Sequence, residues 1–173
     1  MTPRGNWRTT TPDRGERVLA RKRRIGIIGS SRPSAEGSRL AEAVGRLLGE
    51  AGAVLICGGL GGIMEAAARG AAGVGGLTVG LLPGSQAADA NPYIALPLPT
   101  GLSYARNILV VRASQALIAI EGGYGTLSEI AFALQLGVPL IGLHTAYQDP
   151  KIRRAGSPEE AVSLALTAAG EAT

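Results

Sequence analysis

With 173 residues the chain fits one domain, and it has no apolar run near the ~20 residues of a membrane span. Residues 1–24 hold eight basic and two acidic side chains. The rest of the chain has nine basic and eleven acidic residues and is therefore mildly acidic. Because the net charge of +4 comes from the first 24 residues, it does not indicate nucleic-acid binding by the rest of the chain. A single cysteine, Cys57, excludes an intramolecular disulfide, and Cys57 with the single histidine, His144, is too few for a cysteine- or histidine-rich metal site.

Short apolar runs alternate with stretches of helical period along most of the chain. Residues 1–24 lack a sustained period and read as a basic N-terminal arm, followed by one domain at residues 25–173. Runs typical of strands cover residues 25–29, 53–57, 77–82, 93–98, 116–120 and 138–143, and the first two are typical of strands buried in a sheet. Stretches of helical spacing cover residues 38–50, 63–70, 103–113, 126–136 and 158–169, with Thr126 and Ser157 as capping residues.

This alternation predicts an α/β protein of the Rossmann-like, doubly wound type. Its mainly parallel sheet should have about six or seven strands, with helices on both faces. The loops that follow the strands then emerge at one edge, where open sheets of this kind bind ligands.

Three of these loops are rich in glycine, which lets backbone amides approach a phosphate closely. They follow the first, second and fifth strands. The candidate phosphate-binding residues are Gly29, Ser30 and Ser31; Gly58, Gly59, Gly61 and Gly62; and Gly122, Gly123, Tyr124, Gly125 and Thr126. Neither the Gly-x-Gly-x-x-Gly fingerprint nor a Walker lysine is present, so NAD binding and ATP hydrolysis are not expected.

The predicted helix at residues 103–113 is apolar nearly all round, apart from Arg106 and Arg112. One sheet face cannot cover so many apolar sides. We therefore expect this helix to be buried or to lie at a subunit interface, in a homodimer or tetramer.

The segment from Gly122 to Glu129, Gly-Gly-Tyr-Gly-Thr-Leu-Ser-Glu, resembles the Pro-Gly-Gly-x-Gly-Thr-x-x-Glu motif of the family once labelled "possible lysine decarboxylase". That family includes the cytokinin-activating phosphoribohydrolases, known as Lonely Guy, and the molybdenum-cofactor carrier proteins. Residues 58–65 resemble its second glycine loop, which adds Met64 and Glu65 to the candidate site. The resemblance covers roughly residues 25–143 and implies at least a dimer.

Lysine decarboxylation is not expected, because a pyridoxal phosphate enzyme needs a lysine in its pocket. The chain has only Lys22, in the arm, and Lys151, in a loop after the sixth strand. We expect no pyridoxal phosphate, no required cofactor and a cytoplasmic location.

Two functions within the family remain open, beside a third in which the fold senses a nucleotide for signalling. In a phosphoribohydrolase the resemblance implies that Arg106 and Glu129 cleave the N-glycosidic bond of a nucleoside 5′-monophosphate. Asn107 and Glu121 depart from that pattern, in which a lysine and a proline stand. Residues 100–107 look closer to the carrier branch, in which the glycine loops and Arg106 and Asn107 would hold a nucleotide monophosphate or the phosphate of the molybdenum cofactor, with no bond broken.

Overall fold

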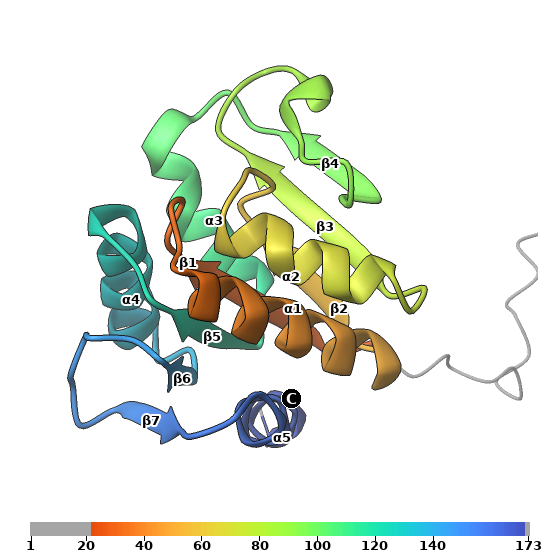
Figure 1. The fold of residues 1–173 in the computed structure, drawn as a ribbon. Helices are drawn as coiled ribbons and strands as arrows, with labels where there is room; N and C mark the ends of the chain where they lie inside the picture. Colours follow the sequence, from red (N-terminus) through yellow and green to blue (C-terminus); the bar gives the residue numbers. More distant parts are fainter. Residues whose placement is uncertain (1–21, 172–173) are drawn as a thin grey trace, which may run out of the picture.

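Strands and helices alternate along residues 22–171, the part of the chain that the computed structural model describes (Figure 1). The strands are β1 (Arg24–Gly29), β2 (Val54–Cys57), β3 (Leu77–Leu82), β4 (Leu96–Pro99), β5 (Ala116–Ile120), β6 (Leu140–Leu143) and β7 (Ile152–Ala155). The helices are α1 (Ala35–Glu50), α2 (Ile63–Ala72), α3 (Asn107–Ala113), α4 (Tyr124–Leu136) and α5 (Pro158–Glu171), with 3-10 turns η1 (Ala87–Asp89) and η2 (Ser103–Arg106).

All seven strands form one parallel sheet in the order β4-β3-β2-β1-β5-β6-β7. The chain moves outward from β1 to β4, returns to the centre through α3, and moves outward again from β5 to β7. This confirms the doubly wound, Rossmann-like fold. The strand order reverses between β1 and β5, which is where such sheets open a crevice for a ligand.

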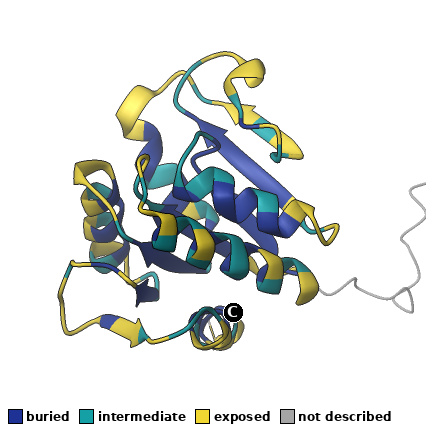
Figure 2. Ribbon diagram, in the orientation of Figure 1, coloured by how far each residue is buried: buried dark blue, intermediate teal, exposed yellow. Residues whose placement is uncertain are grey.

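Helices cover both faces of the sheet. On one face α1, α2 and α5 pack on side chains such as Ile27, Leu55 and Ile118, and on the other face α3 and α4 pack on Ile28 and Leu117. In Figure 1 α1 and α2 lie side by side in front of the sheet. Figure 2 shows the central strands as buried ribbon, with more exposed residues on the edge strand β4.

The two helices α1 and α2 approach each other very closely. A Cβ at Gly45 would overlap with the backbone of Ala67, and a Cβ at Gly70 would overlap with the backbone of Glu42. Glycine at positions 45 and 70 therefore allows α1 and α2 to pack in close contact.

Several boundaries differ from the sequence-based prediction. Thr126 is not a cap: α4 begins two residues earlier, with Gly123 as its N-cap, and the Thr126 side chain is buried within the helix. Residues 103–113 form two pieces, the 3-10 turn η2 and then α3, instead of one helix. The loop expected after the sixth strand contains the edge strand β7.

The predicted arm at residues 1–24 lies outside the described residues except for its last three, and Arg24 already belongs to β1. Within residues 22–171, no helix combines the length and the apolar character needed to cross a bilayer.

Candidate functional site

A cavity of about 560 Å³ opens at the carboxyl ends of β1 and β5, where the strand order reverses. Loops that follow β1, β2 and β5 contribute to it, as do η2 and the first turns of α3 and α4. It is lined by Ile28, Gly29, Ser30, Ser31, Arg32, Leu60, Met64, Tyr104, Arg106, Asn107, Gly122, Gly123, Tyr124, Gly125, Thr126 and Glu129. The topology thus brings together chain segments separated by nearly a hundred residues.

Most of the candidate residues named from the sequence line this cavity. The exceptions are Gly58, Gly59, Gly61, Gly62 and Glu65, all in or just after the loop that follows β2. Four lining residues were not named as candidates: Ile28, Arg32, Leu60 and Tyr104. Leu60 and Tyr104 lie in the segments that resemble the family, residues 58–65 and 100–107, and Arg32 follows Ser31, but nothing in their spacing indicates that they reach the cavity.

Among the glycines after β2, Gly62 contacts the loop that follows β1. Gly62 has a φ of 73°, and a Cβ there would overlap with the backbone of Ser30 and Ser31. The N–H of the next residue, Ile63, donates to the Ser30 carbonyl at 2.9 Å. Gly62 and Ile63 therefore support the loop after β1, while Leu60 of the same glycine loop lines the cavity.

Arg106 is a buried cation that lacks a protein partner. Its side chain is 7% exposed, and its Nε is a buried donor with no hydrogen bond within the described chain. Burial lowers the pKa of the guanidinium, while the negative charge of Glu129 acts in the opposite direction. Gly58 makes room for it, because a Cβ at Gly58 would overlap with Nη1 of Arg106. An unpaired buried cation on a cavity wall is a strong attractor for an anion.

Glu129 lies on the same cavity, one turn into α4, and is 7% exposed. Burial raises its pKa to about 7, and the charge of Arg106 offsets only part of that effect. The two side chains interact electrostatically, but no ion pair or hydrogen bond joins them within residues 22–171. A carboxyl group with such a pKa can hold or release a proton near neutral pH.

The N-terminus of α4 borders the cavity and has no side-chain cap. Its first turn is held in place by Asn107, whose amide nitrogen donates to Ser128 Oγ at 2.9 Å and to the Gly125 carbonyl at 3.4 Å. The Tyr147 hydroxyl donates to the Gly123 carbonyl at 2.9 Å. The first-turn N–H groups and the positive end of the helix dipole are therefore presented to the cavity in a fixed position.

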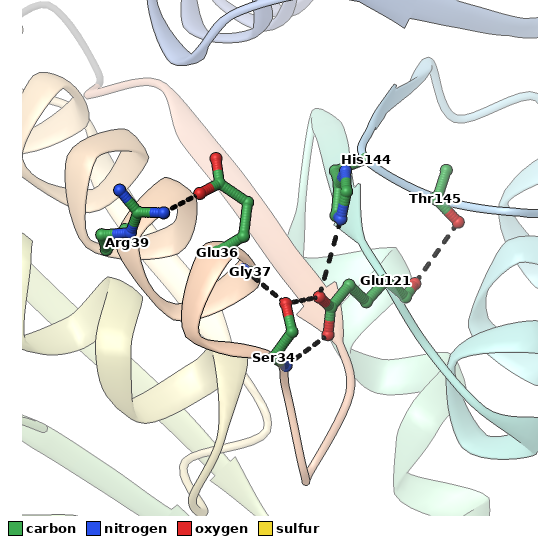
Figure 3. A network of polar contacts seen from close by, with 7 residues as sticks. All are labelled: Ser34, Glu36, Gly37, Arg39, Glu121, His144 and Thr145. Carbon is green, nitrogen blue, oxygen red and sulfur yellow. Dashed lines mark hydrogen bonds and ion pairs between the residues drawn. The ribbon is translucent and has the colours of Figure 1, made fainter.

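Glu121, the acidic residue in place of the family's proline, does not point into the cavity. Figure 3 shows its carboxylate between α1 and β6, where it accepts hydrogen bonds from the backbone N–H of Ser34, at 3.1 Å, and from the Ser34 hydroxyl. Nε2 of His144 lies 3.9 Å from Oε1 of Glu121, the oxygen that accepts the Ser34 hydroxyl. The Glu121 carboxylate therefore holds Ser34, the residue whose Oγ caps α1, and Glu121 is not among the residues that line the cavity.

A second hollow, of about 670 Å³, lies beside the β6–β7 connection. Its cation, Arg154, already donates to the carbonyls of Thr145 and Tyr147. The cation of this hollow is thus already bonded to backbone carbonyls, and its carboxylate, Asp149, accepts the N–H of Lys151 at 2.8 Å. Among the described residues, no cluster of three or more His, Cys, Asp or Glu side chains could hold a metal ion.

Comparisons with known proteins identify the family and the fold. The profile of the SLOG cluster4 family matches residues 22–170. A protein of Archaeoglobus fulgidus, described as uncharacterised, is 43% identical over 143 residues, which are 83% of this chain and 94% of that one.

Two solved structures resemble the fold closely. The molybdenum cofactor binding protein of Rippkaea orientalis is 33% identical, with a TM-score of 0.81, covering 86% of this chain and 98% of that one. The molybdenum cofactor carrier protein of Chlamydomonas reinhardtii is 27% identical, with a TM-score of 0.77, covering 87% of this chain and 99% of that one. The expected resemblance to the carrier branch is confirmed.

Proposed function

Because the chain belongs to the SLOG cluster4 family, we propose that it binds the molybdenum cofactor, or a similar phosphorylated pterin or nucleotide, as a carrier. The phosphate would sit between Arg106 and the first turn of α4, where the guanidinium and the backbone N–H groups both face the cavity. The proteins of Rippkaea orientalis and Chlamydomonas reinhardtii, named for binding and carrying this cofactor, support this choice of ligand.

The observation that carries the proposal is the unpaired Nε of the buried Arg106. A buried donor without a partner costs free energy in the empty protein, and a phosphate oxygen would recover that cost on binding. Gly123 and Gly125 border open space in which a phosphate could lie, since nothing lies within 4 Å of a Cβ added at either position.

Purification from a host that makes the cofactor tests this proposal. The bound pterin is released, oxidised and measured by fluorescence, and binding of inorganic phosphate is measured by calorimetry. We expect pterin to accompany the unaltered protein and to be lost from an Arg106→Met variant. Absence of both pterin and phosphate binding from the unaltered protein would refute the proposal.

Glu129 favours a second candidate, a nucleoside 5′-monophosphate phosphoribohydrolase. Its pKa of about 7 suits a group that accepts a proton from an attacking water, and its ionised form would stabilise a positively charged ribose in the transition state. In this reading Arg106 holds the phosphate and Glu129 acts at the N-glycosidic bond. Incubation with AMP distinguishes the two functions: released adenine and ribose 5-phosphate would favour the hydrolase, provided that Glu129→Gln abolishes release.

We also propose that the protein forms a homo-oligomer through the sheet face beside α3. Leu96 and Leu98 of β4 are exposed, and they pair in register with Val79 and Leu81 of β3, so they extend an apolar face that the short α3 leaves uncovered. A second copy of the chain would cover this face. Sedimentation equilibrium should show at least a dimer that Leu98→Glu weakens, and a monomer at all concentrations would contradict this.

A further inference from the structure

Two tyrosines stand out on the rim of the cavity. Tyr104 is 84% exposed and Tyr124 is 92% exposed, and both belong to the cavity lining. The other described aromatic residues, Tyr93, Phe132 and Tyr147, are half-buried. Only 3% of the chain is aromatic, so the placement of its two most exposed described rings at one opening calls for an explanation.

Both rings belong to segments of the proposed phosphate site, which is formed by Arg106 and the first turn of α4. Tyr104 lies in η2, the same turn as Arg106, and its carbonyl accepts the N–H of Asn107. Tyr124 is the first residue of α4, next to the glycines that approach a phosphate. A ligand whose phosphate reaches Arg106 would therefore have the rest of its structure beside these rings.

The cavity has an apolar part as well as a charged part. Ile28, Leu60 and Met64 line it from β1 and from the segment after β2. Such a surface is unsuited to a bare sugar, whose hydroxyl groups would lose hydrogen bonds to water. It suits the face of a flat ring system.

We infer that Tyr104 and Tyr124 stack on a planar heterocycle, so that the ligand of this cavity is a ring system joined to a phosphate and not a sugar phosphate alone. This inference rests on the proposed phosphate site at Arg106 and adds the recognition of the other end of the ligand. Stacking on tyrosine rings tolerates different bases, because every heterocycle offers a π face. The tyrosines select for a flat ring, whereas Arg106 selects for the anion.

Calorimetry with four ligands tests the inference: inorganic phosphate, ribose 5-phosphate, AMP and a pterin monophosphate. The variants Tyr104→Leu and Tyr124→Leu keep apolar bulk but remove the ring, and Tyr104→Phe and Tyr124→Phe keep the ring. Each leucine variant should weaken AMP and pterin monophosphate about tenfold, as expected for one lost stacking partner. The phenylalanine variants should bind these ligands like the unaltered protein, and inorganic phosphate and ribose 5-phosphate should be unaffected by any of the four.

Other outcomes separate this inference from the proposed function. If phosphate binds through Arg106 but AMP and the pterin bind no more tightly than ribose 5-phosphate, the stacking role is wrong and the phosphate site stands. If the leucine variants change the sedimentation behaviour and leave every affinity unchanged, the tyrosines serve an interface and the inference is wrong. If none of the four ligands binds and Arg106→Met has no effect, the proposed function and the inference both fail.

Discussion

The Glu121 carboxylate accepts a hydrogen bond from the backbone N–H of Ser34 at 3.1 Å, which ties the glycine loop after β5 to the N-terminus of α1 (Figure 3). In doubly wound folds the helix after the first strand commonly offers its N-terminus to a ligand phosphate. Here the chain's own carboxylate occupies that position, and Ser34 Oγ accepts the N–H of Gly37 at 2.9 Å. The N-terminus of α4, which has no side-chain cap, is the helix end that the proposed ligand would meet.

This contact predicts that Ser34 and Glu121 are coupled in stability. Ser34→Ala should cost about 1 kcal/mol, the usual value for an N-cap. Glu121→Ala should cost about 1–2 kcal/mol, because it removes an acceptor shared by two donors. In urea unfolding, the double variant should lose about 0.5–1 kcal/mol less unfolding free energy than the sum of the two single losses. Strict additivity of the losses would show that the two residues act independently.

Replacing Glu121 by proline, the residue found in the family motif, should be more damaging than replacing it by alanine. Glu121 has a φ of 53°, which proline cannot adopt, and its N–H donates to the His144 carbonyl at 3.1 Å. We expect a loss of about 3 kcal/mol or more in the free energy of unfolding. A Glu121→Pro variant as stable as Glu121→Ala would mean that this turn readily takes another conformation.

Arg106→Met should make the ligand-free protein more stable and the ligand affinity much lower. Removing a buried, incompletely bonded cation relieves its desolvation cost, and we expect a gain of about 1 kcal/mol in thermal or urea unfolding. Phosphate affinity should fall about 100-fold, the effect of losing a charge-assisted contact. Arg112→Met, on the exposed side of α3, is the matched control and should change neither quantity.

Glu129 should make the protein less stable as the pH rises from about 4.5 to about 7. Its folded-state pKa of about 7 lies above its ordinary value of 4.5, so between these values the unfolded chain has lost the proton that the folded protein still holds. Stability then decreases from about pH 4.5 to about pH 7 and levels off above it, with a total change of order 3 kcal/mol at most.

Urea unfolding across this pH range checks the expectation. Glu129→Gln should remove this decrease, while Glu159→Gln, an exposed glutamate of α5, should leave it in place. An unchanged pH profile in Glu129→Gln would show that Glu129 titrates in the same way in both states.

Gly58→Ala should weaken anion binding, although residue 58 does not itself line the cavity. A Cβ at this position would overlap with Nη1 of Arg106 and approach Sδ of Met64 to 2.7 Å, so the guanidinium must shift. We expect phosphate affinity to fall about tenfold, since a displaced guanidinium loses its geometry toward the anion. Gly61→Ala is the control, because its Cβ would meet only Glu65, at 3.6 Å, and equal losses in both variants would argue against a specific effect on Arg106.

The strands that the sequence predicted well are those whose apolar runs are continuous, such as residues 116–120. The edge strand β7 was missed because Ile-Arg-Arg-Ala is only half apolar, and because residues 144–151 lead to it from β6 without the helix that usually connects parallel strands. The first residues of α4 were missed because glycine at 125 weakens the helical pattern there.

By itself the sequence determined the alternation of strands and helices, and with it the shared edge of the glycine loops, because apolar periodicity is a local property of the chain. Only the tertiary structure decided what each side chain at that edge does. Arg106 became a buried cation whose Nε has no hydrogen bond within the described chain, Glu129 was withdrawn from water, and Glu121 bonds to Ser34, the N-cap of α1. Burial and partners depend on segments far apart in the chain, and no local pattern records which of them will meet.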